Sequence, residues 1–200
     1  DDAVSGWTAC VVAALLEERD IMRGRPDTLP ADLAIRVKAV MQLDGHDLID
    51  RGALHRVRDS ARDIARRSGI DSNVGITADM VDTLTGAVLL SAYPDRLAMR
   101  RSSAGQFVMR GGGGVTCDPK DHIGREKFVV AADIDQQRGG SRMCRGAAVD
   151  LDLIAPVLGD DVELETWLQW DKSRNDLVMH VVRKVGSIRI DERDIPPTPG

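Results

Sequence analysis

A change of pattern near the middle of the 200 residues constrains the fold more than any other feature. Before about residue 94, apolar side chains recur at the three- and four-residue spacing of amphipathic helices. Later residues form short β-branched runs between glycines. With 42% apolar residues, a chain of this length can bury one large core or two small ones. We therefore expect an α+β protein with a helical bundle over 1–94 and a β-domain over 95–195.

Four segments of the first half have helical periodicity and recognisable ends. Ser5 is a plausible N-cap for the first helix, which ends before Gly24, and Thr77 is one for the fourth helix, which Pro94 stops. Gly69 suits the left-handed position that follows a helix, so it should end the third. The expected helices cover about 5–23, 30–43, 47–68 and 77–93.

Short runs of the second half, separated by turn-forming residues, have strand-forming composition. The expected strands are Gln106–Arg110, Lys127–Ile134, Arg142–Val149, Val162–Trp170 and Leu177–Val185. The polar segment 171–176 predicts a hairpin between the last two strands. The segment 151–158 indicates a short helix or a turn between strands. A small antiparallel barrel with one inserted helix is the outline of an OB-fold. We expect 196–200 to be a disordered tail.

Net charge and apolar runs exclude some classes of protein. A net charge of -5 argues against binding nucleic acid through bulk electrostatics, so any such role must be local. The longest purely apolar stretch, Ala9–Leu16, is too short to cross a bilayer. We expect a cytoplasmic protein without membrane contact.

The candidate chemistry-bearing residues form no recognisable active site. Cys10, Cys117 and Cys144 are scattered without a C-x-x-C pair, so we expect three free thiols, mostly buried. The four histidines share no spacing that places two metal ligands together or a base beside a nucleophile. We predict no catalytic residue and no metal site. An enzyme using Cys117 or Cys144 as its nucleophile stays an alternative, which alkylation of the thiols would test.

Four consecutive glycines follow Arg110 and invite comparison with a phosphate-binding loop. A Walker A loop needs a lysine followed by serine or threonine after its glycines, and no Lys-Ser or Lys-Thr pair directly follows the glycines here. We interpret 111–114 as a loop between strands. No cofactor is expected in this chain.

The residues that could contact nucleic acid lie around the expected junction of bundle and barrel. They are Arg96, Arg100, Arg101, Phe107 and Arg110. Arginines beside an aromatic ring can hold a single strand through its phosphates and bases. The alternative is that Arg96 and Arg101 form ion pairs at the junction and that the Phe107 ring belongs to the core. A second arginine set on the third expected helix alternates with aspartates, which is typical of a salt-bridged solvent face.

The segment 92–101, Ala-Tyr-Pro-Asp-Arg-Leu-Ala-Met-Arg-Arg, resembles the C-terminal region of bacterial DEAH-box helicases of the HrpB type. Upstream, residues 13–20 resemble the A-L-L-x-E-R-D segment of the helicase-associated helical domain of the same family. Residues 128–135 and 185–192 resemble later strands. The similar segments keep the order of the family from residue 9 to about 192.

The resemblance implies a helicase-associated helical bundle and an OB-like barrel, both following two RecA-like motor domains. ATP and magnesium would bind in those motor domains, whose motifs are absent from this sequence. The chain would then be a non-catalytic accessory region that guides single-stranded RNA and contacts the motor domains. The family has a polar or basic residue between its glycines, whereas here Arg110 precedes all four. The alternative is a protein-interaction module without nucleic-acid contact, and nothing in the sequence indicates an oligomeric state.

Overall fold

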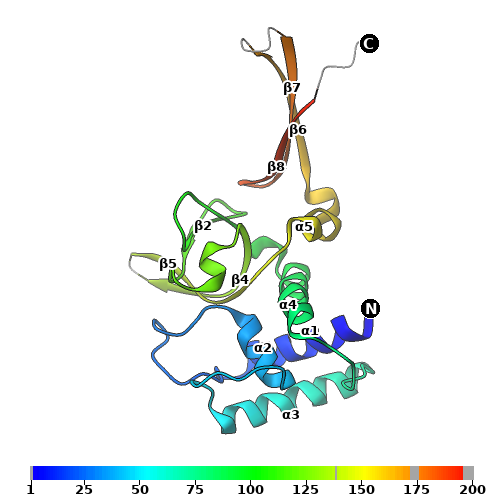
Figure 1. The fold of residues 1–200 in the computed structure, drawn as a ribbon, viewed down its shortest axis with the longest axis vertical. Helices are drawn as coiled ribbons and strands as arrows, with labels where there is room; N and C mark the ends of the chain where they lie inside the picture. The colour runs from blue at the N-terminus through cyan, green and yellow to red at the C-terminus, as the bar shows by residue number, and fades with distance from the viewer. Residues whose placement is uncertain (1, 138, 172–175, 196–200) are drawn as a thin grey trace.

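The computed structural model describes residues 2–137, 139–171 and 176–195. Helices form one end of the molecule, a small β-barrel lies in the middle, and a three-stranded sheet projects from the other end (Figure 1). The expected tail at 196–200 and most of the expected turn between the last two predicted strands lie outside the described residues. Within the described ranges, no helix is both long enough and apolar enough to cross a membrane.

The helical end contains α1 (Asp2–Glu17), α2 (Leu33–Met41), α3 (Arg51–Ser68) and α4 (Ala78–Ala92). Two expected ends are confirmed: Gly69 follows α3 with a φ of 68°, and the Thr77 hydroxyl accepts the Met80 N–H at the start of α4. The prediction of Ser5 as N-cap was wrong, because α1 begins at Asp2. The helix includes the residues before Ser5 because the Val4 side chain is buried against the core. Asp32, rather than Pro30, marks the start of α2, because its carboxylate accepts the Ala34 N–H.

The barrel contains β1 (Leu97–Arg100), β2 (Gln106–Met109), β3 (Gly114–Thr116), β4 (Phe128–Gln137) and β5 (Gly140–Ala148). Its closed order is β1-β2-β3-β5-β4, with every pair antiparallel except β3 and β5. A closed five-stranded barrel of this Greek-key order is OB-like, as the sequence predicted. Two short 3₁₀ segments, η1 (Pro94–Arg96) and η2 (His122–Arg125), precede β1 and β4.

The prediction of which strands form the barrel was partly wrong. The runs at 162–170 and 177–185 do form strands and pair as a hairpin, but they belong to a separate sheet of β6 (Glu163–Asp171), β7 (Asp176–Val185) and β8 (Ile188–Ile195). The predicted helix at 151–158 is confirmed as α5 (Leu151–Leu158), which lies between the last barrel strand and the first strand of the separate sheet, and η3 (Gly159–Asp161) leads from it into β6. The barrel is completed by β1 and β3, whose four and three residues are too few to show a period.

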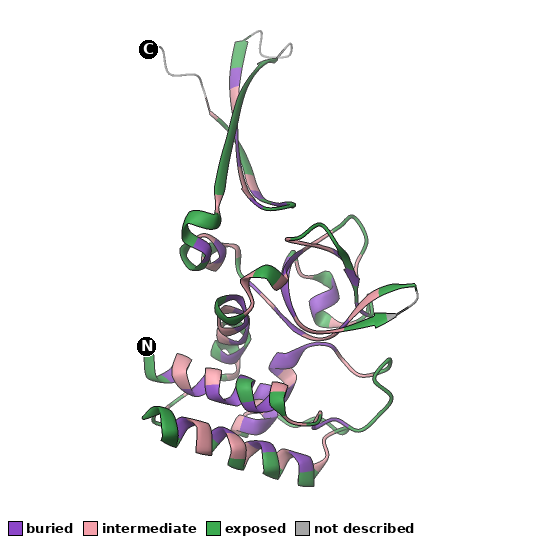
Figure 2. Cartoon of the chain, turned by 180° about the vertical axis from the view of Figure 1, so that it is seen from behind, coloured by how far each residue is buried: buried purple, intermediate pink, exposed green. Residues whose placement is uncertain are grey.

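Two apolar clusters hold these parts together. The first joins the inward faces of the helices to α5, β7, β8 and one side of β1 and β4. The second fills the barrel and includes Ala98, Phe107 and Val115. Neighbouring residues of β1 divide between the clusters, because successive side chains of a strand point to opposite sides: Leu97 faces the helices and Ala98 faces the barrel interior. Figure 2 shows this buried zone and the exposed length of β6 beyond it.

Candidate nucleic-acid interface

The barrel has the opposite charge to the rest of the chain. Residues 97–148 contain nine Lys and Arg against five Asp and Glu, a net charge of +4. The same count gives -4 for residues 1–96 and -5 for residues 149–200. A basic region in an otherwise acidic protein is the local electrostatic feature that phosphate contact requires.

Arg101 lies where OB-folds commonly bind oligonucleotides, at the β1–β2 loop and the face of β2 and β3. The residue is exposed, and its backbone N–H donates to the Gln106 carbonyl at 2.8 Å. One terminal guanidinium nitrogen lies 3.8 Å from the position that a β-carbon on Gly114 would occupy, so the side chain reaches β3. Among the described residues, none forms an ion pair with Arg101.

Arg100 is the last residue of β1 and pairs with Phe107 of β2. Its backbone N–H donates to the Lys127 carbonyl at 2.8 Å, so the ends of β1 and of the η2–β4 connection lie side by side. The guanidinium Nε of Arg100 is buried and has no hydrogen-bond partner within the described ranges. A buried N–H without an acceptor is uncommon in proteins.

The β1–β2 loop also touches η2, because the Gly105 N–H donates to the Gly124 carbonyl at 2.7 Å. Gly105 has a φ of +72°, and a β-carbon there would lie 2.5 Å from the Cys117 carbonyl oxygen, so this close approach requires glycine. It brings the next residue of η2, Arg125, near the loop. We call Arg100, Arg101, Arg125 and Lys127 the barrel-end cluster.

Arg125 and Lys127 were missed by the sequence analysis. Both are exposed, and the Lys127 ammonium lies 4.9 Å from the centroid of the Phe128 ring. Glu126 between them is half-buried and lies 3.7 Å from His122. In the sequence Arg125 and Lys127 flank Glu126 and are far from Arg100, so only the folded barrel brings these basic residues together.

Arg96 and Arg110 are already bound to protein groups. Arg96 lies 3.7 Å from the Asp95 carboxylate and donates to the Ala132 carbonyl at 3.4 Å. Arg110 forms an ion pair of 3.1 Å with Asp161, and its side chain is only 24% exposed. Both therefore take part in junctions of the barrel with neighbouring segments. For Arg96 this is the alternative left open by the sequence, whereas the ion pair of Arg110 was not expected.

The Phe107 ring is 1% exposed and lies in the barrel interior. The expected stacking of a base on this ring required it to face outward, and the structure corrects that expectation. The reason is register: Phe107 pairs with Val115, whose side chain is fully buried, and paired residues of neighbouring strands share a face.

The glycine segment forms the turn between β2 and β3. The Gly112 N–H donates to the Met109 carbonyl at 2.8 Å, and Gly112 has a φ of +87°. The interpretation as a loop between strands is confirmed for 111–113, and Gly114 is the first residue of β3. A phosphate loop would instead join a strand to a helix.

Thiol chemistry has little support in this fold. The three cysteines are free, and Cys10 and Cys117 are buried, as predicted. Burial, followed by the charges of Asp121 and Asp118, raises the pKa of Cys117 to about 12, so its thiol stays protonated at neutral pH. Burial also raises the pKa of Cys144. Across the described part of the chain, no group of three or more His, Cys, Asp or Glu is arranged to hold a metal ion.

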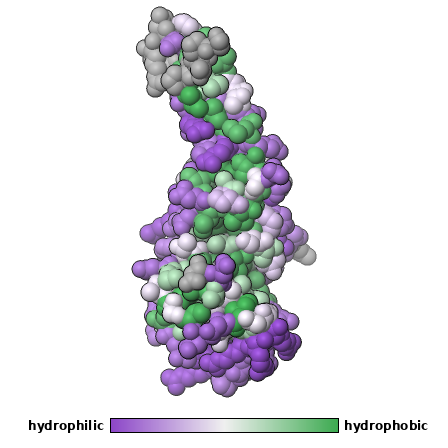
Figure 3. Space-filling view, turned by 90° about the vertical axis from the view of Figure 1, so that its right-hand side faces the viewer, coloured by the Kyte–Doolittle hydropathy of each residue, from purple (hydrophilic) through white to green (hydrophobic). Residues whose placement is uncertain are grey.

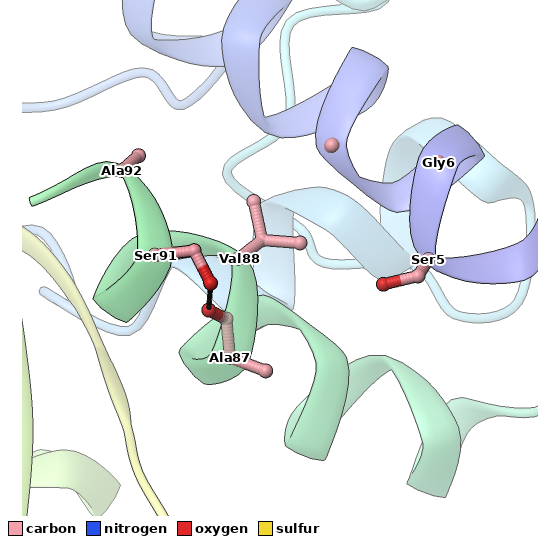
Figure 4. A pocket seen from close by; sticks show the side chains of 7 residues that line it. Ser5, Gly6, Ala87, Val88, Ser91 and Ala92 are labelled. Carbon is pink, nitrogen blue, oxygen red and sulfur yellow. Dashed lines mark hydrogen bonds between the residues drawn. The ribbon is translucent and has the colours of Figure 1, made fainter. Parts of the chain in front are cut away.

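A groove of about 470 Å³ lies between α1 and α4. Figure 4 shows Ser5 and Gly6 of α1 opposite Ala87, Val88 and Ser91 of α4, with the Ser91 hydroxyl donating to the Ala87 carbonyl. No charged residue lines the groove. It therefore offers no charged contact for phosphate, and the barrel-end cluster remains the candidate interface.

Comparison with known proteins agrees with this architecture. No protein-family model and no curated protein matches the chain. Among solved structures, the Escherichia coli DExH-box NTPase HrpB is similar at a TM-score of 0.66 and 19% identity, over 96% of this chain and 21% of that chain. This chain has the fold of a part of HrpB. A second structure, of the E. coli DEAH/RHA helicase HrpB, gives a TM-score of 0.60 and 17% identity over the same shares. The chain spans about a fifth of the length of HrpB.

Proposed function

We propose that this chain is a non-catalytic accessory region of an ATP-dependent RNA helicase. Its OB-like barrel guides single-stranded RNA, and its helical bundle braces RecA-like motor domains of the same protein in the cytoplasm. ATP and magnesium bind in those motor domains. The observation that carries the proposal is a positively charged barrel, in an acidic chain, with the fold of part of an HrpB helicase.

The barrel-end cluster suits contact with the RNA backbone rather than reading of bases. Arginine and lysine bind phosphates of any sequence, and each contact releases a condensed counterion. The one aromatic ring expected to stack on bases, that of Phe107, is buried. We therefore expect weak binding that does not discriminate sequence and falls with salt.

Polar contacts fix the barrel on the bundle, so a bundle that braces the motor domains would also hold the barrel in place. The Arg145 guanidinium donates to the Leu15 carbonyl at the end of α1 and pairs with Asp133 at 2.9 Å. Arg142 donates to the Asp27 carbonyl at 2.6 Å, and backbone bonding continues where Gly146 donates to Ala31 at 2.9 Å. A barrel held this way would follow movements of the bundle as one body.

Binding of a fluorescently labelled oligouridine, measured by anisotropy at two salt concentrations, tests the proposal. The Arg100→Ala/Arg101→Ala variant should weaken binding and flatten the plot of log affinity against log salt by about one to two units. The control is Arg62→Ala/Arg66→Ala on α3, because both arginines form exposed ion pairs with aspartates there. The control should bind RNA as the unmodified chain does.

Three results would contradict the proposal. The unmodified chain could fail to bind RNA at low salt, the two double variants could lose equal affinity, or affinity could be insensitive to salt. Thermal unfolding of each variant separates loss of a contact from loss of the fold.

A protein-interaction module is the second candidate. Exposed large apolar side chains on β6 favour it, because a sheet edge of this kind binds other chains more readily than phosphate.

A further inference from the structure

The β6 strand is an edge of the C-terminal sheet and is exposed along its whole described length. Leu164 is 65% exposed, Leu168 60% and Trp170 52%, and all three share one face because alternate residues of a strand point the same way. Figure 3 shows hydrophobic side chains at the surface of the projecting sheet, interleaved with hydrophilic ones. The strand therefore offers both unpaired backbone groups and apolar side chains to a partner.

The opposite edge of the same sheet is built differently. There β8 has four consecutive charged residues, 191–194, and such charges are how natural sheets prevent an edge from pairing. Comparable protection is missing from the centre of β6, where Thr166, Trp167 and Leu168 follow one another. The contrast indicates that β6 is the edge to which another strand adds.

We propose that two copies of this chain pair through β6 as antiparallel strands, with Thr166 on the two-fold axis. Leu164 then lies opposite the partner's Leu168, Val162 opposite the partner's Trp170, and Thr166 opposite its own copy. On the other face, each glutamate lies opposite a neutral residue: Glu163 faces the partner's Gln169, and Glu165 faces the partner's Trp167. Two three-stranded sheets become one six-stranded sheet with an isologous interface.

Charge and side-chain pairing select this register. Moving the axis one residue toward the N-terminus places Glu165 opposite its own copy, and like charges directly opposite are destabilising. Moving it one residue toward the C-terminus places Leu168 opposite the partner's Thr166, so the leucine pair is lost. In the proposed register, Glu165 also keeps its ion pair with Lys184 of β7.

The shape of the molecule permits the pairing. The C-terminal sheet projects away from the barrel and helices, and β6 runs outward from the body (Figure 1). In an antiparallel pair, the two bodies therefore lie at opposite ends of the joined sheet. A parallel pair would bring both bodies to the same end, so the fold favours the antiparallel arrangement.

Sedimentation equilibrium of the 200-residue chain tests this pairing. At high micromolar concentration we expect twice the monomer mass of 21.7 kDa. Leu164→Lys/Leu168→Lys places lysine opposite lysine at two positions and should weaken dimerisation about tenfold or more, as should Leu164→Glu/Leu168→Glu. An equimolar mixture of these two variants should dimerise again, because residue 164 of each then faces the opposite charge on residue 168 of the other. The control is Met80→Lys, an exposed residue of α4 that should leave dimerisation unchanged.

The mixture separates the proposed register from non-specific adhesion of apolar surface. A monomeric chain at every concentration would overturn the proposal. So would a lysine variant that stays dimeric, or two variants that remain monomeric when mixed. Because the substituted leucines are exposed, unfolding temperatures should stay close to that of the unmodified chain, and this is checked on the same samples. None of these outcomes depends on RNA binding.

Discussion

Arg110 at the end of β2 forms an ion pair with Asp161 of η3, with 3.1 Å between guanidinium nitrogen and carboxylate oxygen. The Arg110 carbonyl also accepts the N–H of Ser187, between β7 and β8, at 2.9 Å. One residue thus ties the barrel to two segments at the inner end of the C-terminal sheet, where Glu163 of β6 pairs with Lys184 of β7. This position gives Arg110 a structural role that the sequence, with its glycines following, did not reveal.

Replacing Arg110 by alanine should therefore affect stability more than RNA binding. Because Asp161 is 54% exposed, the ion pair is screened, and we expect a loss of about 0.5–1 kcal/mol in the free energy of unfolding. Urea unfolding measures the loss, and RNA anisotropy should show unchanged affinity. Weaker RNA binding at unchanged stability would instead make Arg110 a nucleic-acid contact, as the sequence analysis expected.

Replacing Arg36 should cost far more. Its side chain is 1% exposed, donates to both Asp20 carboxylate oxygens at 2.7 and 2.9 Å, and donates to the Pro30 carbonyl at 2.8 Å. Burial raises the pKa of Asp20, but the hydrogen bonds and charge of Arg36 outweigh it, so the pKa is lowered. Arg36→Met leaves this carboxylate unpaired, and we expect a loss of about 3–5 kcal/mol in urea unfolding.

The matched control for Arg36 is Arg23→Met. Arg23 forms an ion pair of 2.8 Å with Asp50, but its side chain is 69% exposed. We expect a loss of less than about 1 kcal/mol there. Equal losses of unfolding free energy in the two variants would show that burial of the Arg36–Asp20 ion pair does not increase its contribution to stability.

Phe107→Ala should destabilise the barrel by about 3–5 kcal/mol, because it leaves a cavity in a closed apolar interior. Phe107→Leu should retain much of the stability. RNA affinity per folded molecule should be the same for both variants, since the ring is buried. Selective loss of RNA binding in a fully folded Phe107→Ala protein would argue that the ring turns outward to stack on bases.

The isolated chain should neither bind nor hydrolyse ATP. Its glycines form a turn between strands and lack the lysine and hydroxyl that hold phosphates and magnesium. The unfolding temperature should be the same with and without magnesium and ATP. A reproducible, saturable rise on adding both would refute this prediction.

Helix caps and strand-forming composition were sufficient to predict most helices and strands of the fold from the sequence. The helix ends at Thr77 and Gly69 could be predicted from the sequence, because each residue satisfies backbone groups within one turn of its own helix. The strands β6 and β7 were recognised by composition, but composition does not say which sheet a strand joins. Their assignment to the barrel was therefore wrong.

The candidate site was less predictable, because it is made by contacts between distant segments. Arg100 and Arg101 were identified as neighbours in the sequence, whereas Lys127 joins them only through the backbone bond between Arg100 and Lys127. The orientation of Phe107 depends on its pairing with Val115, in a strand of three residues that the sequence did not reveal.

Asp32, the N-cap of α2, is a buried carboxylate at the junction of bundle and barrel. It is 7% exposed, accepts the Ala34 N–H at 2.9 Å and lies 3.8 Å from the His122 ring on η2. Burial raises its pKa from 3.8 to about 6. The hydrogen bond from Ala34 and the charge of His122 oppose the rise, and the charges of Asp121 and Asp82 add to it.

Because the folded state holds this proton more tightly than the unfolded state, Asp32 contributes stability that is fully present below about pH 4 and is lost as pH rises through about 6. Asp32→Asn keeps a capping oxygen and removes the titration. At pH 8 the variant should be more stable than the unmodified chain, by on the order of 1–3 kcal/mol, and the gain should shrink toward pH 4.5. Asp20 and Asp191 have lowered pKa values, so their protonation in acid destabilises the folded state. Urea unfolding is therefore compared between pH 4.5 and 8, above the range in which these two groups are protonated. A gain that does not vary with pH, or a variant less stable at pH 8, would show that the Asp32 carboxylate is not a buried charge at neutral pH.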